Sequence, residues 1–155
     1  MTQAAHILIV DDEVNIRNAL VTMLEKKGYR VYGTGTGEEA LRQLDDARMD
    51  LVITDLRMPG ISGMEFLRQL KNKWPDTEVV VMTAFGSIDT AVEAMRLGAY
   101  DYLTKPIDRE RFVVIVEKAL ERRALAYENR QLRDQLETRT RFDQMVGESE
   151  AMQQV

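Results

Sequence analysis

Residues 50–67 read DLVITDLRMPGISGMEFL, and this stretch contains one complete strand-to-helix unit. Its apolar run Leu51–Thr54 is typical of a strand that is buried on both faces of a parallel sheet. Pro59-Gly60 predicts a turn, and the spacing of the apolar residues after it predicts a helix that begins near Ser62. Asp55 therefore stands at the carboxyl end of a buried strand, on the loop that leads to the next helix.

The pattern of a strand followed by a helix occurs five times along the chain. Short β-branched or aromatic runs predict strands at His6–Val10, Arg30–Gly33, Leu51–Thr54, Val79–Met82 and Tyr100–Leu103. Apolar residues with helical spacing lie between and after them, for example Ile16, Ala19, Leu20, Met23 and Leu24. Parallel crossovers need helix-length connections, so the alternation predicts an α/β fold. The expected architecture is a flavodoxin-like (βα)5 doubly wound parallel sheet with strand order 2-1-3-4-5 and a C-terminal helical extension.

The composition fits one ordinary domain with an appendage. The chain has 155 residues, of which 45% are hydrophobic and 30% are charged, so it can bury a real core but cannot hold a second full domain. It contains no Cys, which excludes disulfides and thiolate metal sites. The single His, His6, begins an apolar run, and no second His is present to build a zinc site.

Charge and hydropathy indicate a cytoplasmic protein. The first residues, MTQAAHILIVDDE, lack the basic leader of a secretory signal, and apolar runs such as Phe112–Val116 are too short to span a bilayer. A net charge of −5 gives no overall attraction to nucleic acid or to anionic lipid. Arg122–Arg141 carries six Arg against three acids, but apart from Tyr127 it has no aromatic residues among the Arg, so we favour a solvated helix there over a DNA contact.

Polar residues follow four of the predicted strands. Asp11-Asp12, Asp55, Thr83 and Lys105 stand at these strand ends, and the carboxyl ends of parallel strands converge at one edge of a sheet. Adjacent carboxylates repel each other unless a cation lies between them. Oxygen ligands without His or Cys favour Mg²⁺. The pattern therefore predicts metal-assisted phosphoryl chemistry, in which Asp55 is a third metal ligand or a nucleophile that forms an acyl phosphate.

Each of these residues also has a purely structural alternative. Asp12 or Glu13 could cap the helix that begins at Val14, and Asp55 could form a turn. A β-branched Thr83 needs no functional reason at a strand end, and most Lys residues are simply solvated. Lys105 differs in standing between an apolar strand and Pro106, where the backbone has little freedom.

Taken together, four segments resemble the response-regulator receiver domain, the phosphoacceptor part of a two-component system. They are ILIVDDE, DLVITDLRMPGISGMEFL, VVVMTAFG and GAYDYLTKPID, and the resemblance covers about residues 5 to 121. It implies that Asp55 accepts a phosphoryl group from a phosphohistidine of a sensor histidine kinase. It also implies that Asp12 binds Mg²⁺ directly, that Asp11 binds it largely through water, and that the backbone carbonyl of Arg57 completes the protein ligands.

The same resemblance implies a switch next to the phosphoacceptor. Thr83 bonds the phosphoryl group, the small Ala84 beside it leaves the approach clear, and Lys105 pairs with the phosphoryl group on the side opposite the metal. Tyr102 is the aromatic residue that turns inward when Thr83 moves, which rearranges the fourth helix and the fifth strand. The resemblance further implies a cis peptide bond between Lys105 and Pro106.

Residues 122–141 form a polar, Arg- and Glu-rich helical stretch. If Leu125 and Leu132 occupy d positions of a heptad, Asn129 and Leu136 occupy a positions, as in a two-stranded coiled coil. This predicts a short dimerisation linker after the receiver domain at residues 1–121. The alternative is a single solvated helix, because two heptads are fewer than a firm signal needs.

Residues 142–155, FDQMVGESEAMQQV, resemble the opening of the ATPase module in NtrC-type activators of sigma-54 RNA polymerase. No Walker-type Gly-Lys motif is present, so we assign no ATP hydrolysis to this chain. The expected function is that of a regulatory phosphoacceptor, not an enzyme. We expect the chain to form a homodimer through the linker helix and through the face of the fourth helix and fifth strand. We also expect it to control the downstream ATPase.

Two alternatives compete with this interpretation. One is a Mg²⁺-dependent phosphatase of the haloacid-dehalogenase type, although such enzymes usually have a second acid two residues after the nucleophile, where this chain has Arg57. The other is an interaction module that has kept only the fold. The complete set of Asp11, Asp12, Asp55, Thr83 and Lys105 argues against it.

Overall fold

The computed structural model describes residues 4–84 and 88–154, with side chains described as far as residue 136 except those of residues 88, 126, 127 and 130. The chain divides into two compact units, Met1–Arg123 and Ala124–Val155. The elements in chain order are β1 (His6–Val10), α1 (Val14–Glu25), β2 (Arg30–Thr34), α2 (Gly37–Asp46), β3 (Leu51–Asp55), α3 (Gly63–Lys73), β4 (Glu78–Thr83), α4 (Ile88–Arg96), β5 (Asp101–Thr104) and α5 (Arg109–Gln154).

The five strands form one parallel sheet in the order β2-β1-β3-β4-β5, which confirms the predicted topology. β1 and β3 are the two neighbours at which the winding of the chain reverses direction, and in such sheets ligands bind at the carboxyl edge next to this point. Val10, the last residue of β1, pairs with Thr34 on one side and Thr54 on the other. Asp11 and Asp55 therefore emerge on neighbouring strands.

Four strands, β2 to β5, end one residue later than predicted, and in β3 and β4 the added residue belongs to the candidate site. β3 includes Asp55, which pairs with Met82, and β4 includes Thr83, which pairs with Thr104. The ladder continues because backbone groups, not apolar side chains, make its hydrogen bonds: Leu56 N donates to Met82 O, and Lys105 N donates to Thr83 O. The candidate site residues Asp55 and Thr83 are thus parts of strands and not of loops.

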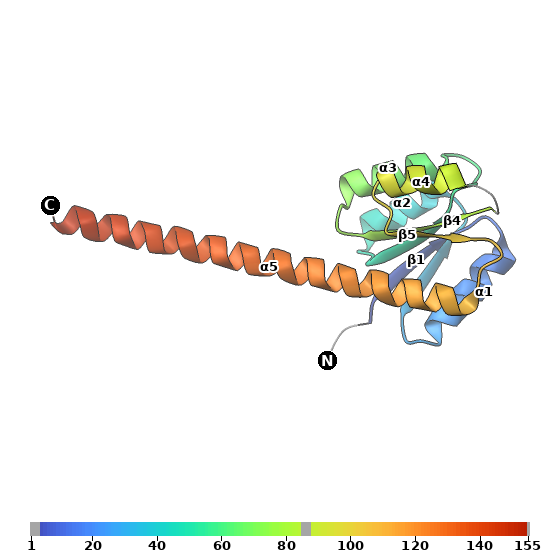
Figure 1. The fold of residues 1–155 in the computed structure, drawn as a ribbon, viewed down its shortest axis with the longest axis horizontal. Helices are drawn as coiled ribbons and strands as arrows, with labels where there is room; N and C mark the ends of the chain where they lie inside the picture. Colours follow the sequence, from blue (N-terminus) through green and yellow to red (C-terminus); the bar gives the residue numbers. More distant parts are fainter. Residues whose placement is uncertain (1–3, 85–87, 155) are drawn as a thin grey trace. The chain divides into compact units, whose positions relative to one another are not determined.

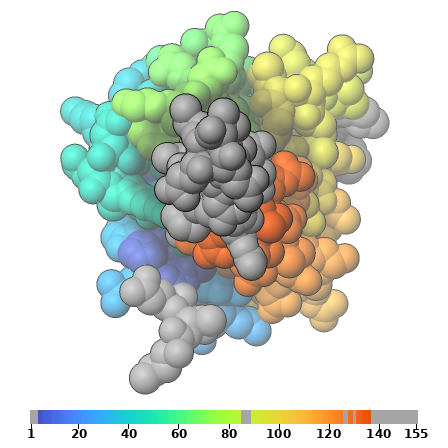
Figure 2. Space-filling model, turned by 90° about the vertical axis from the view of Figure 1, so that its left-hand side faces the viewer, coloured from blue at the N-terminus to red at the C-terminus, as the bar shows by residue number. Residues whose placement is uncertain are grey.

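Helices cover both faces of the sheet. α2, α3 and α4 lie on one face and α1 and the start of α5 lie on the other (Figure 1). Each face has its own apolar core, with Phe66, Leu67 and Leu70 of α3 prominent in the first and Phe112 and Val116 of α5 in the second. In Figure 2, α2 and α3 (cyan to green) occupy the upper left of the unit Met1–Arg123. α4 (yellow) lies at its upper right, and the start of α5 (orange) lies at its lower right.

α5 continues as one helix through residues 122–141 and into residues 142–154. The leucines of the predicted dimerisation linker are exposed in the single chain: Leu125 by 54%, Leu132 by 56% and Leu136 by 61%. Asn129 is exposed as well. The side chains of 142–155, where the start of an ATPase module is predicted, lie outside the described residues. The division at 121 and 141 stays a prediction.

Among the helices that the structure describes, none is both long enough and apolar enough to cross a membrane.

Candidate functional site

Three carboxylates meet at the carboxyl edge of the sheet. One oxygen each of Asp11, Asp12 and Asp55 lies within 4.8 Å of the others. Asp11 and Asp55 are buried, whereas Asp12 is exposed to solvent. This donor set fits Mg²⁺, which accepts oxygen ligands, takes one or two carboxylates and keeps several of its waters. The predicted convergence of these three acids is confirmed.

Backbone amides hold both buried carboxylates. Glu13 N donates to Asp11 Oδ1 at 2.9 Å, and Arg57 N donates to Asp55 Oδ1 at 3.0 Å. Each acid is thereby fixed by the amide two residues further along the chain, a local arrangement typical of Asp. The N-cap position of α1 is Glu13, one of the two residues considered for it, although its side chain makes no capping hydrogen bond.

Lys105 lies between the two buried acids. Its Nζ is 2.7 Å from Asp55 Oδ2 and 3.1 Å from Asp11 Oδ2. Burial lowers the pKa of Lys105, but the hydrogen bonds to Asp55 and Asp11 and their negative charges outweigh it and raise the pKa above its usual value. Lys105 therefore remains a cation at neutral pH. It offsets the repulsion between carboxylates that would otherwise be buried side by side.

The predicted switch residues surround the same edge. Thr83 is buried, and its Oγ1 donates to Leu103 O over a long 3.5 Å. Ala84 follows it and is half-buried. Tyr102 is partly buried against the core that α2, α3 and α4 cover. The Lys105-Pro106 peptide bond is cis, as the resemblance implied.

Comparison with known proteins decides the family. Residues 7–117 match the family described as the response regulator receiver domain. The chain belongs to this family. Curated relatives of the receiver include the regulatory protein AtoC of Escherichia coli, 36% identical over 100% of this chain and 34% of AtoC. The C4-dicarboxylate transport transcriptional regulatory protein DctD of Pseudomonas aeruginosa is 41% identical over 96% of this chain and 32% of DctD.

Solved structures agree with this assignment. NtrX from Brucella abortus has a TM-score of 0.78 and 36% identity, covering 81% of this chain and 29% of that one. The beryllofluoride-activated NtrC4 receiver domain dimer has a TM-score of 0.73 and 36% identity, covering 76% of this chain and 98% of that one. The predicted kinship with NtrC-type regulators is confirmed by these relatives, and the chain spans about a third of the length of the first two curated relatives.

The loop after Asp55 in this receiver is fixed by contacts that the sequence did not reveal. Ile61 N donates to Glu38 Oε1 at 2.8 Å, which ties the loop to the first turn of α2. A Cβ on Gly63 would lie 2.4 Å from Leu56 Cα and 2.8 Å from Asp55 O. Only glycine fits there, because both atoms belong to the backbone. Gly60 adopts a φ of +84°, which glycine tolerates best.

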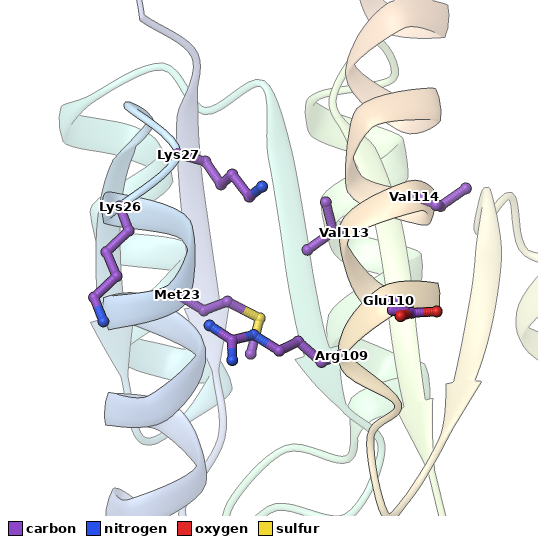
Figure 3. A pocket seen from close by; sticks show the side chains of 7 residues that line it. All are labelled: Met23, Lys26, Lys27, Arg109, Glu110, Val113 and Val114. Carbon is purple, nitrogen blue, oxygen red and sulfur yellow. The ribbon is translucent and has the colours of Figure 1, made fainter.

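A separate groove of about 670 Å³ lies between α1 and α5 of the receiver. Met23 of α1 lines one side together with Lys26 and Lys27, which directly follow this helix. The other side is lined by four residues of α5: Arg109, Glu110, Val113 and Val114. In Figure 3, the side chains of Lys27 and Arg109 extend into the space between the two helices. The groove is basic at its rim, and none of the three clustered acids lines it. It is therefore distinct from the acid cluster.

Proposed function

We propose that this receiver accepts a phosphoryl group on Asp55 from a phosphohistidine of a sensor histidine kinase, in the presence of Mg²⁺. The observation that carries the proposal is that Asp55 clusters with Asp11 and Asp12 within 4.8 Å and has Lys105 Nζ 2.7 Å from its carboxylate. Acceptance of a phosphoryl group needs a carboxylate nucleophile with positive charge beside it; Lys105 supplies one such charge, and a Mg²⁺ held by the three acids would supply the other.

In the transfer, a carboxylate oxygen of Asp55 forms a bond to phosphorus while the bond from phosphorus to the histidine nitrogen breaks. Bound Mg²⁺ supplies the charge that neutralises the phosphoryl oxygens. Asp12 would bind the ion directly, Asp11 would bind it largely through water, and the Arg57 carbonyl would complete the protein ligands. Arg57 N holds Asp55 Oδ1, which orients the carboxylate before the reaction. Lys105 moves its hydrogen bond from Asp55 Oδ2 to a phosphoryl oxygen.

Thr83 carries the signal away from the site. Among the described residues its hydroxyl makes one hydrogen bond, the long 3.5 Å bond to Leu103 O, which costs little to exchange for a bond to a charged phosphoryl oxygen. The small side chain of Ala84 beside Thr83 leaves the approach clear. The movement of Thr83 opens space into which Tyr102 turns, and this biases α4 and β5 towards a second arrangement.

The readout is a change in how two chains pair. The linker at residues 122–141 joins two copies through Leu125, Asn129, Leu132 and Leu136, and the face of α4 and β5 forms the second contact. A dimer is also the form of the activated NtrC4 receiver domain. Residues 142–155 begin the following ATPase module, whose activity the receiver at residues 1–121 controls.

Acetyl phosphate and Mg²⁺ test the proposal without a kinase. We expect intact mass spectrometry to show one added phosphoryl group on the wild type and none on Asp55→Asn. Asp45→Asn is the matched control, because Asp45 is an exposed acid of α2 that pairs with Lys73, and it should label like the wild type. Equal labelling of Asp55→Asn would contradict the site assignment. Continuous turnover of simple phosphomonoesters would favour the phosphatase alternative.

A further inference from the structure

Arg17 reaches back from α1 to the end of β1. Its Nη1 donates to the backbone carbonyl of Asp11 at 2.9 Å, and the side chain is half-buried. This carbonyl belongs to the peptide bond that joins Asp11 to Asp12. The orientation of that peptide sets the direction in which Asp12 leaves the strand, because the rest of Asp11 is already fixed.

Asp11 is held at every other polar group. Its N donates to Thr34 O at 3.1 Å, its Oδ1 accepts from Glu13 N, and its Oδ2 accepts from Lys105 Nζ. Arg17 therefore provides the contact to the one remaining group, the carbonyl. A backbone carbonyl just past the end of a strand needs a partner from a side chain or water, since the ladder no longer supplies one.

Two glycines make room for the Arg17 side chain. A Cβ on Gly33 would lie 3.1 Å from Arg17 Cδ, and a Cβ on Gly35 would lie 3.1 Å from Arg17 Nη1. Neither glycine has the positive φ seen at Gly28 and Gly60, so the backbone conformation does not require glycine at either position. What these positions share is close contact with Arg17, which lies across the chain at the end of β2.

We propose that Arg17 is a positioning residue for the metal-binding acids, holding the Asp11–Asp12 peptide so that Asp12 is directed towards the Mg²⁺ site. This inference rests on the proposed function. A guanidinium near a cation site opposes cation binding through its charge. The charge of Arg17 and its positioning of Asp12 therefore have opposite effects on Mg²⁺ affinity. If Arg17 acted mainly by its charge, its removal would strengthen Mg²⁺ binding, whereas loss of positioning weakens it.

Measuring Mg²⁺ affinity without any phosphoryl donor separates the charge effect of Arg17 from its positioning effect. We expect calorimetric titration to show binding weakened by about tenfold in Arg17→Met, as is usual when a contact that orients a metal ligand is lost. Arg17→Lys keeps the charge and one donor and should recover part of the affinity. Arg42→Met makes the same change at an exposed Arg of α2 and should bind Mg²⁺ like the wild type.

Gly35→Ala provides a second way to weaken the contact between Arg17 and Asp11 O, and it leaves Arg17 in the chain. Its methyl group would lie 3.1 Å from Arg17 Nη1, so the guanidinium must shift and its hydrogen bond to Asp11 O is weakened; Mg²⁺ affinity should fall although the charge is retained. In the double variant with Arg17→Met, Gly35→Ala should have no further effect, since the two changes act on one contact. Labelling of Asp55 by acetyl phosphate should need more Mg²⁺ in each variant but reach the wild-type rate at saturation.

The outcomes distinguish the two proposals. A wild type that binds no Mg²⁺ contradicts the proposed function itself. A wild type that binds Mg²⁺, together with an Arg17→Met variant that binds it equally or more tightly, overturns only the positioning role of Arg17. Additive effects of Arg17→Met and Gly35→Ala overturn it as well. Thermal unfolding of each variant identifies losses that come from a damaged fold.

Discussion

At the scale of single residues, Lys105 compensates the negative charge of the buried carboxylates in the site. Asp11 and Asp55 are buried carboxylates, and the Lys105 ammonium lies within 3.1 Å of the first and 2.7 Å of the second. Removing one member of a buried charge cluster leaves the others without compensation, which costs far more than losing an exposed ion pair. The same cation can therefore serve stability before phosphorylation and phosphoryl binding after it.

The first prediction concerns Lys105→Met. At pH 7 without Mg²⁺, we expect the free energy of unfolding to fall by about 3 kcal/mol, since two buried carboxylates lose their counterion. Added Mg²⁺ should recover part of this loss by replacing the missing positive charge. Urea unfolding with and without Mg²⁺ measures both effects. Lys118→Met, at an exposed Lys of α5, is the control and should change stability by about 0.5 kcal/mol or less. Equal stability of Lys105→Met and the wild type would contradict this role.

At this scale, the sequence could predict the positions of residues that stand at the ends of predicted strands. Asp11, Asp12 and Asp55 could be placed together because parallel strands share one carboxyl edge. The contacts of Arg17 and Glu38 could not be predicted. Glu38 reaches Ile61 across 23 residues, and only the packing of α2 against the loop brings them together. Thr83 is predicted as a site residue from the end of its strand, but its bond to Leu103 O depends on the register of β4 and β5.

At the scale of elements, α2 holds the loop that follows Asp55, the proposed phosphoacceptor. Thr36 caps α2 by accepting a hydrogen bond from Glu39 N, and Glu38 in the same turn accepts one from Ile61 N. The loop between β3 and α3 is thus tied to the start of a neighbouring helix on one side and packed tightly at Gly63 on the other. The chain around Asp55 is held by elements that contribute no ligand of their own.

The second prediction follows from the pKa of Glu38. The hydrogen bond from Ile61 N lowers this pKa below its usual value of 4.5. A carboxyl group with a lowered pKa in the folded state stabilises the fold above the unfolded pKa, and this stabilisation disappears as the pH falls through the folded pKa. Glu38→Gln should therefore reduce the free energy of unfolding at pH 7 but make little difference near the lowest pH at which the protein is still folded.

Glu39→Gln is the matched control for this effect. Glu39 lies in the same first turn of α2 and shares the favourable interaction with the helix dipole, so the difference between the two variants isolates the contact with the loop. Urea unfolding of both variants across the acid range provides the comparison. Identical pH profiles for Glu38→Gln and Glu39→Gln would show that the hydrogen bond to Ile61 contributes nothing.

At the scale of the whole molecule, the structure refines where the receiver should be cut from its linker. Arg123 is buried with its Nε 3.9 Å from Asp50 Oδ1, and Arg122 Nε lies 3.9 Å from Glu78 Oε1. Both contacts join α5 to the amino edge of the sheet. A truncation at the predicted boundary of 121 would remove them. A truncation after Ala124 keeps them and makes a fairer test of the linker.

The last prediction is that the linker pairs two chains before phosphorylation. Leu132 is 56% exposed in the single chain, and burying a leucine side chain is worth roughly 1.5–3 kcal/mol, so pairing through this stripe gains stability. We expect the full chain to sediment as a dimer. Leu132→Asp and the truncation after Ala124 should both sediment as monomers, because a charge at a d position cannot be buried in a coiled coil.

Gln131→Asp is the matched control, since it adds the same charge one residue away, at the c position of the predicted heptad, which faces away from the seam, and should remain dimeric. A dimer that survives both Leu132→Asp and the truncation would place the pairing on the receiver itself, and then the face of α4 and β5 would be the contact to disrupt. A monomeric wild type would contradict the linker prediction directly. Repeating the sedimentation after labelling with acetyl phosphate tests whether the charge at Asp55 alters the pairing, which is the step that connects the site to the rest of the molecule.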